Sequence, residues 1–203
     1  FLRKENFNLY NAISMYLPNT YDFYWNTSAV NFRNRMLKEY RRFWSIERVN
    51  QAKDKGINPL QVSVLASIIK KETSKADERN RIAGVYLNRI KKGMLLQADP
   101  TIIYSIKLIN DNFDTIIKRV LFSDLKINSI YNTYKYKGLP PGPISMPDLS
   151  SINSVLNSEN HKYLFFVADP TNPGYHKFSK SLKKHNYYRR KYVNWLNKKK
   201  LYR

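Results

Sequence analysis

The sequence contains no cysteine among its 203 residues. This absence excludes disulfide bonds, thiolate nucleophiles and cysteine-based metal sites, while an oxidising compartment is permitted but not required. Histidine is also scarce, because only His161, His176 and His185 occur, and their separations of 15 and 9 residues match no compact metal-binding motif. We therefore expect neither a metal site nor a cofactor.

Long apolar segments are absent as well. No run of about 18 apolar residues occurs, so no membrane span is predicted, and no signal peptide is recognisable. The chain begins with Phe-Leu-Arg-Lys and without Met, and we expect it to be part of something longer. A hydrophobic content of 42% and an aromatic content of 14% are typical of a globular protein. Without internal repeats or low-complexity linkers, a single domain is predicted.

Acidic residues are few: 15 Asp and Glu stand against 36 Lys and Arg, which gives a net charge of +21. Such a surplus favours binding to a polyanion, namely nucleic acid, anionic lipid headgroups or an acidic cell-wall polymer. A genome rich in A and T is the alternative explanation, since Lys, Asn, Ile and Tyr are all abundant. No helix-turn-helix, RNP-type or zinc-finger signature occurs, so no nucleic-acid partner is predicted.

The clearest helix start lies at Asn58. Asn58 is placed to cap the helix, Pro59 takes the first helical position, and Gln61 stands where a capping box requires Glu or Gln. The expected helix covers residues 59–72.

Glu72 ends the apolar face of this helix. Val62, Leu65 and Ile69 precede it at steps of 3, 4 and 3 residues, which is the spacing of one helix face. A carboxylate at this position is predicted to be partly desolvated, with a raised pKa that suits a general acid. Two features oppose this interpretation: a frayed helix end would release Glu72 into solvent, and Lys75 is close enough in sequence to lower the pKa.

The remaining patterns predict an α+β fold, mostly helical, with a small antiparallel sheet. Asp99 is predicted to cap a short helix whose next residue is Pro100. The other expected elements are short extended pieces before residue 28, helices over 29–54, 76–92 and 112–121, a stiff surface loop over 138–143, a buried strand over 163–168 with a hairpin partner over 175–178, and a basic helix in the last 23 residues.

Four segments occur in an order and at separations that resemble the MltG/YceG-like endolytic murein transglycosylases. They are residues 66–73, 93–104, 131–134 and 138–144. Further matches lie at residues 85–89, 165–169, 176–178 and 185–186, so the resemblance spans about residues 12–195. It implies that residues 1–203 form the catalytic domain of such an enzyme.

The resemblance also implies a function and a location. Members of the family cleave the β-1,4 bond between N-acetylmuramic acid and N-acetylglucosamine of nascent glycan strands, leave 1,6-anhydromuramic ends, and terminate glycan polymerisation. They are anchored in the bacterial inner membrane by an N-terminal helix and act on its periplasmic side. That anchor and most of any LysM-like module are expected to lie outside this chain. Peptidoglycan strands are the expected partner, with peptidoglycan synthases as further candidates.

The family's catalytic glutamate falls on Glu72, and Lys70 replaces a second Glu found in many relatives. The resemblance assigns substrate binding to Gln97, Asp99, Thr101, Tyr104, Tyr131, Asn132 and Tyr134, and a supporting role to Asn88 and Arg89. Structural alternatives stay open: helix capping for Asp99, a core position for Tyr104, and a turn that fixes the Pro-rich loop for residues 131–134. His176 and His185 are expected to be hydrogen-bonded, partly buried histidines.

A single carboxyl group suffices for this reaction, because the 6-hydroxyl of the sugar is the nucleophile. Two other functions remain possible. One is a hydrolytic muramidase, with Asp99 or Asp77 as the second carboxylate that hydrolysis requires. The other is a polyanion-binding or cell-wall-binding module without catalysis.

Overall fold

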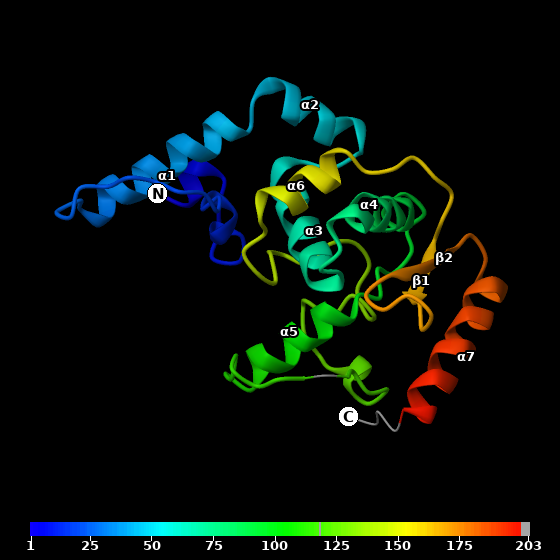
Figure 1. The fold of residues 1–203 in the computed structure, drawn as a ribbon. Coiled ribbons are helices and arrows are strands. Elements are labelled where there is room, and N and C mark those ends of the chain that lie inside the picture. The colour runs from blue at the N-terminus through cyan, green and yellow to red at the C-terminus, as the bar shows by residue number, and fades with distance from the viewer. Residues whose placement is uncertain (118, 200–203) are drawn as a thin grey trace.

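The computed structural model describes residues 1–117 and 119–199. Figure 1 shows three helices, α3, α4 and α6, grouped at the centre, with α1 extending to one side and a two-stranded sheet and α7 on the other. The elements are, in chain order, η1 (Arg3–Glu5), η2 (Ala12–Met15), α1 (Ala29–Phe43), α2 (Ile46–Asp54), α3 (Pro59–Glu72), α4 (Ala76–Lys91), α5 (Asp99–Ile109), η3 (Asp124–Lys126), α6 (Leu149–Leu156), β1 (Phe165–Ala168), β2 (His176–Ser179) and α7 (Leu182–Lys198). The predicted α+β class is confirmed.

Helix α3 forms the centre of the domain, and its predicted bounds are confirmed. The capping box is complete, since the Gln61 amide donates to Asn58 Oδ1 and the Asn58 amide donates to Gln61 Oε1, both at 2.9 Å. Every residue from 62 to 69 is buried. A helix that is buried on all sides is rigidly held, so the position of its C-terminal residue is fixed by packing.

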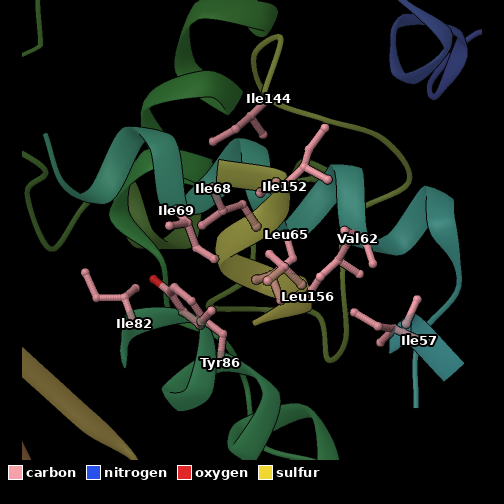
Figure 2. Packing of buried hydrophobic residues seen from close by; sticks show 14 of the residues in the cluster. Ile57, Val62, Leu65, Ile68, Ile69, Ile82, Tyr86, Ile144, Ile152 and Leu156 are labelled. Carbon is pink, nitrogen blue, oxygen red and sulfur yellow. The ribbon is translucent and has the colours of Figure 1, made fainter. Parts of the chain in front are cut away.

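The core joins α3 to α4 and α6 (Figure 2). Val62, Leu65 and Ile69 are 0% exposed and pack in one cluster with Ile82 of α4 and Ile152 of α6. Burying each of these side chains contributes about 1.5–3 kcal/mol relative to leaving it in water. The predicted apolar face of α3 is therefore a core face.

Helix α6 is an element that the sequence patterns did not predict. It has only eight residues, and Asp148 caps it by accepting from the Ser151 amide at 2.7 Å. Its serines and asparagine favour turns as much as helix. Packing against α3 and α4 stabilises it, and Lys70 and Arg79 both pair with Asp148.

Two predicted helices differ from the structure. The expected helix over 29–54 is broken at Trp44, which is buried, and Ser45 starts α2 by accepting from the Arg48 amide. Residues 112–117 and 119–121 contain no helix. The Asn112 side chain accepts from the amides of residues 114 and 115 at 3.2 Å, and such a local turn competes with helix formation.

The Pro-rich loop over 138–143 lies partly inside the domain, so its predicted surface position is wrong. Pro140, Gly142 and the following Ile144 are buried. A Cβ added to Gly142 would lie 1.8 Å from the Tyr10 carbonyl oxygen, which shows how closely the N-terminal segment covers the loop. The Ile144 amide donates to Ser67 Oγ of α3 at 3.0 Å, and this bond ties the loop to the central helix.

The hairpin is confirmed with a register that pairs Phe165 with Ser179 and Ala168 with His176. Its first strand is half-buried, so the prediction of a buried strand is wrong in this respect. Of the predicted C-terminal helix, residues 182–198 form α7, and residues 200–203 lie outside the described part of the chain. Among the described helices, none combines the length and the apolar character that crossing a membrane requires.

Candidate active site

Glu72 is the last residue of α3 and is held there by its neighbours. Thr73 adopts an extended conformation, with φ −143° and ψ 139°, and its Oγ1 accepts from the Lys75 amide at 3.0 Å. The chain therefore turns away immediately after Glu72. Glu72 is half-buried, and its Oε1 accepts a hydrogen bond from the Tyr86 hydroxyl of α4. The frayed helix end considered from the sequence is not observed.

Burial raises the pKa of Glu72 from an ordinary 4.5 to about 7. The negative charge of Asp99 raises it further, whereas the Tyr86 hydrogen bond and the positive charge of Arg89 lower it. The direction predicted from the helix face is confirmed. The alternative in which Lys75 lowers this pKa is not observed, because its ammonium group lies over the Tyr175 ring, 5.0 Å from the centroid.

Arg89 braces the segment that follows α4. It is 7% exposed, and its guanidinium donates to the carbonyl oxygens of Leu164 at 2.6 Å, Leu95 at 3.1 Å and Leu96 at 2.8 Å. A longer contact of 3.4 Å reaches Gln97 Oε1. A planar fork of donors suits such a set of acceptors. This agrees with the predicted supporting role.

Asn88 braces a different segment from the one predicted. Its side-chain amide donates to the carbonyl oxygens of His161 at 2.8 Å and Tyr163 at 3.0 Å. These residues lead into β1, so Asn88 fixes the approach to the hairpin rather than the loop beside Glu72.

Asp99 supplies a second carboxylate close to the first. The residue that caps α5 is Ala98, and Asp99 is the first residue within the helix, so its predicted capping role is wrong. Its Oδ1 accepts a hydrogen bond from the Tyr134 hydroxyl instead. Desolvation raises the pKa of Asp99, and the bond from Tyr134 opposes that rise. Two tyrosine–carboxylate pairs, Tyr86–Glu72 and Tyr134–Asp99, thus lie within electrostatic reach of each other.

The other predicted substrate-binding residues divide by exposure. Gln97 is exposed, with a left-handed φ of 52°, and Tyr104 is half-buried. Thr101 and Asn132 are 0% exposed and Tyr131 is 3% exposed. The structure therefore brings Asp99 and Tyr134 within electrostatic reach of Glu72 and leaves Gln97 exposed. It places Thr101, Tyr131 and Asn132 inside the domain and Tyr104 at its half-buried edge.

The buried residues have structural partners. Thr101 Oγ1 bonds to Thr133 Oγ1 at 2.8 Å, and the side-chain Nδ2 of Asn132 donates to the carbonyl oxygens of Leu125 and Ile127. Tyr131 packs its ring against Tyr104 at a centroid distance of 4.7 Å. These contacts favour a structural role for residues 131–133 over direct contact with substrate.

Tyr86 is the functional candidate that sequence reasoning missed. It lies four residues from both Ile82 and Ile90 on α4, a spacing that is typical of an apolar helix face. A tyrosine on a buried helix face requires a partner for its hydroxyl group. That requirement was the available signal, but the sequence does not say which group is the partner.

The three histidines lie outside this constellation. His176 Nδ1 is 2.8 Å from Glu78 Oε2, and His161 Nε2 is 2.9 Å from the Arg81 carbonyl oxygen. His185 stacks on Phe165, but within the described structure its buried Nδ1 has no hydrogen-bond partner. The expectation of a satisfied histidine is thus confirmed for His176 and wrong for His185. No group of three or more potential ligands that could hold a metal ion occurs within residues 1–117 and 119–199.

The raised pKa of Glu72 predicts that the difference in folding stability between the wild type and Glu72→Gln depends on pH. The folded state binds the Glu72 proton more tightly than the unfolded chain, so stability falls as the pH rises from 4.5 to about 7. We expect Glu72→Gln to raise the free energy of unfolding by about 2–3 kcal/mol near pH 8 and to change it little near pH 4. Urea unfolding at both pH values measures this, and an equal difference at both values would contradict the proposed burial of the carboxyl group.

Comparisons with known proteins identify a family and several relatives. The chain matches the YceG-like family over residues 3–191. It is 36% identical over 196 residues to an endolytic murein transglycosylase of Bacillus subtilis, covering 96% of this chain and 52% of that protein. A Streptococcus pneumoniae protein of the same name is 32% identical over 154 residues, covering 76% of this chain and 27% of that protein.

A solved structure agrees with the fold. The crystal structure of a yceG-like protein from Listeria monocytogenes superposes with a TM-score of 0.69 at 34% identity, covering 86% of this chain and 54% of that one. The chain thus spans about half the length of the Bacillus subtilis relative and of the Listeria protein. The match over residues 3–191 shows that the chain belongs to the YceG-like family.

Proposed function

We propose that this domain is an endolytic peptidoglycan transglycosylase. It cleaves the β-1,4 bond between N-acetylmuramic acid and N-acetylglucosamine and leaves a 1,6-anhydromuramic end. The observation that carries the proposal is the carboxyl group of Glu72, whose burial raises its pKa to about 7. A group with this pKa is available both as an acid and as a base near neutral pH. The names of the relatives support the same reaction and substrate.

The reaction needs one carboxyl group used twice. Glu72 first gives its proton to the glycosidic oxygen while the bond from that oxygen to C1 of the muramic acid breaks. The acetamido group of the substrate stabilises the positive charge at C1. The Glu72 carboxylate then removes the proton of the 6-hydroxyl as this oxygen bonds to C1. No water is consumed, and Glu72 regains its proton.

The accessible residues beside Glu72 are the proposed substrate contacts. Gln97 and Asp99 are exposed, and Tyr134 reaches Asp99 through its hydroxyl group. Their amide, carboxylate and hydroxyl groups can bond to sugar hydroxyl and acetamido groups. Thr101, Tyr104, Tyr131 and Asn132 are assigned to the support of this surface, because their observed contacts are with other residues of the domain.

The proposal includes the biological setting of the enzyme. The enzyme acts on nascent glycan strands on the periplasmic side of the bacterial inner membrane and ends their polymerisation. Peptidoglycan synthases are its proposed partners, and a segment outside this chain is proposed to provide membrane attachment. The family membership supports this setting.

The mass of the products tests the reaction. Digestion of purified peptidoglycan is expected to yield muramic ends that are one water lighter than reducing ends and that contain no label when the reaction is run in heavy-oxygen water. Reducing ends that carry the label would instead identify a hydrolytic muramidase in which Asp99, the neighbour of Glu72, activates water. Binding to peptidoglycan without any cleavage would favour the binding module.

A further inference from the structure

Tyr86 contacts the carboxyl group of Glu72 from within the core of the domain. It is 1% exposed, and its hydroxyl donates to Oε1 of Glu72. In Figure 2 the ring lies inside the core cluster, with its hydroxyl oxygen on the side where Ile69 and Ile82 are found. Phe166 of β1 packs edge-on against the ring at a centroid distance of 5.7 Å and an angle of 89°. The hydroxyl group is thus held in place from several sides.

This contact makes the two carboxyl oxygens of Glu72 different. Burial, the charge of Glu72 and the hydrogen bond to it hold the pKa of Tyr86 well above its ordinary 10.0, so the hydroxyl keeps its proton and acts as a donor. A proton on Oε1 would face the donated hydrogen of Tyr86. In the described part of the chain, Oε2 makes no hydrogen bond.

We propose that Tyr86 is a positioning residue that occupies Oε1 of Glu72 and thereby directs the catalytic proton to Oε2. Oε2 then delivers the proton to the glycosidic oxygen and later receives the proton of the 6-hydroxyl. During the interval between these steps, Tyr86 stabilises the carboxylate through Oε1. This inference rests on the proposed transglycosylase function, since it assigns a role within the same reaction.

The other charged and titratable groups around Glu72 do not replace this contact. Arg89, on α4, acts on Glu72 through its charge while its guanidinium donates to carbonyl oxygens. Asp99, on α5, acts through its negative charge, and the Tyr134 hydroxyl donates to Asp99. Tyr86 is therefore the neighbour that distinguishes one oxygen of Glu72 from the other.

Tyr86→Phe removes the hydroxyl group and keeps the ring. We expect kcat to fall about 10-fold, because the proton is no longer confined to the productive oxygen, with KM nearly unchanged. The fall of kcat/KM on the alkaline side is also expected to move to higher pH, because the lost bond normally lowers the pKa of Glu72. Tyr40→Phe is the matched control. It removes the hydroxyl group of a partly buried tyrosine away from Glu72, in the cluster with Phe7, and is expected to leave kcat and the pH profile unchanged.

The outcomes separate this inference from the function on which it rests. If Glu72→Gln is inactive while Tyr86→Phe keeps the wild-type kcat and pH profile, the role of Tyr86 is overturned and the function stands. If Glu72→Gln retains activity, both are overturned. A purely structural role would lower the amount of folded enzyme without moving the pH profile.

Should Tyr86→Phe fail to fold, 3-fluorotyrosine incorporated at position 86 provides the second test. Its more acidic hydroxyl group is a stronger hydrogen-bond donor and lowers the pKa of Glu72 further. The fall of kcat/KM on the alkaline side is therefore expected to move to lower pH. An unchanged profile would overturn the proposal.

Discussion

Glu72→Gln is expected to lower the rate of anhydro-product formation by at least about 1,000-fold, within the range that general acid–base catalysis contributes. The variant keeps the size of the side chain and an oxygen that can accept from Tyr86, but the amide can neither give nor take the catalytic proton. The domain is expected to fold and to bind peptidoglycan. Single-turnover assays on purified glycan strands, with the products weighed, measure the effect.

The control for this experiment is Glu47→Gln. Glu47 is an exposed residue in the first turn of α2, so its replacement makes the same chemical change away from the site. Its activity is expected to equal that of the wild type. Retention of more than about one tenth of the activity by Glu72→Gln would contradict the assignment of Glu72 as acid and base.

Arg89→Met is expected to destabilise the fold by about 3–5 kcal/mol, because three buried or part-buried carbonyl acceptors lose their donor at once. The carbonyl oxygens of Leu95, Leu96 and Leu164 all accept from this guanidinium, and the Met side chain cannot donate to them. Urea unfolding followed by circular dichroism measures the loss. Arg89→Lys is expected to recover only part of it, because an ammonium group cannot reproduce the planar fork.

Arg42→Met serves as the comparison for this variant, since Arg42 is an exposed residue near the end of α1. Its change in stability is expected to stay within about 0.5 kcal/mol. If the free energy of unfolding of Arg89→Met lay within about 1 kcal/mol of the wild-type value, the carbonyl contacts of Arg89 would not be holding residues 95–97 in place.

The features that sequence analysis predicted correctly depend on residues close together in the chain. The capping box of Asn58 and Gln61 involves neighbours three residues apart, and its two bonds form as expected. The face that ends in Glu72 follows from helical periodicity alone. The hairpin of β1 and β2 is also local, because short connections favour antiparallel neighbours.

The errors fall where packing overrides local preference. Helix α6 forms because α3 and α4 cover it, although its own residues are weak helix formers. The N-terminal segment at Tyr10 covers the loop at Gly142, which the composition placed on the surface. Asp99 has the sequence context of a helix cap, but the helix starts one residue earlier and Tyr134 donates to its carboxylate.

The sequence by itself determined the helical class, the central helix and the placement of a carboxylate at the end of a core-facing stripe, because each follows from periodicity and capping. Only the tertiary structure decided the chemistry of that carboxylate. Its pKa depends on Tyr86, Arg89 and Asp99, which come from other elements, and on desolvation by the surrounding domain. Such through-space contacts have no spacing rule in the chain, so no pattern of residues could specify them.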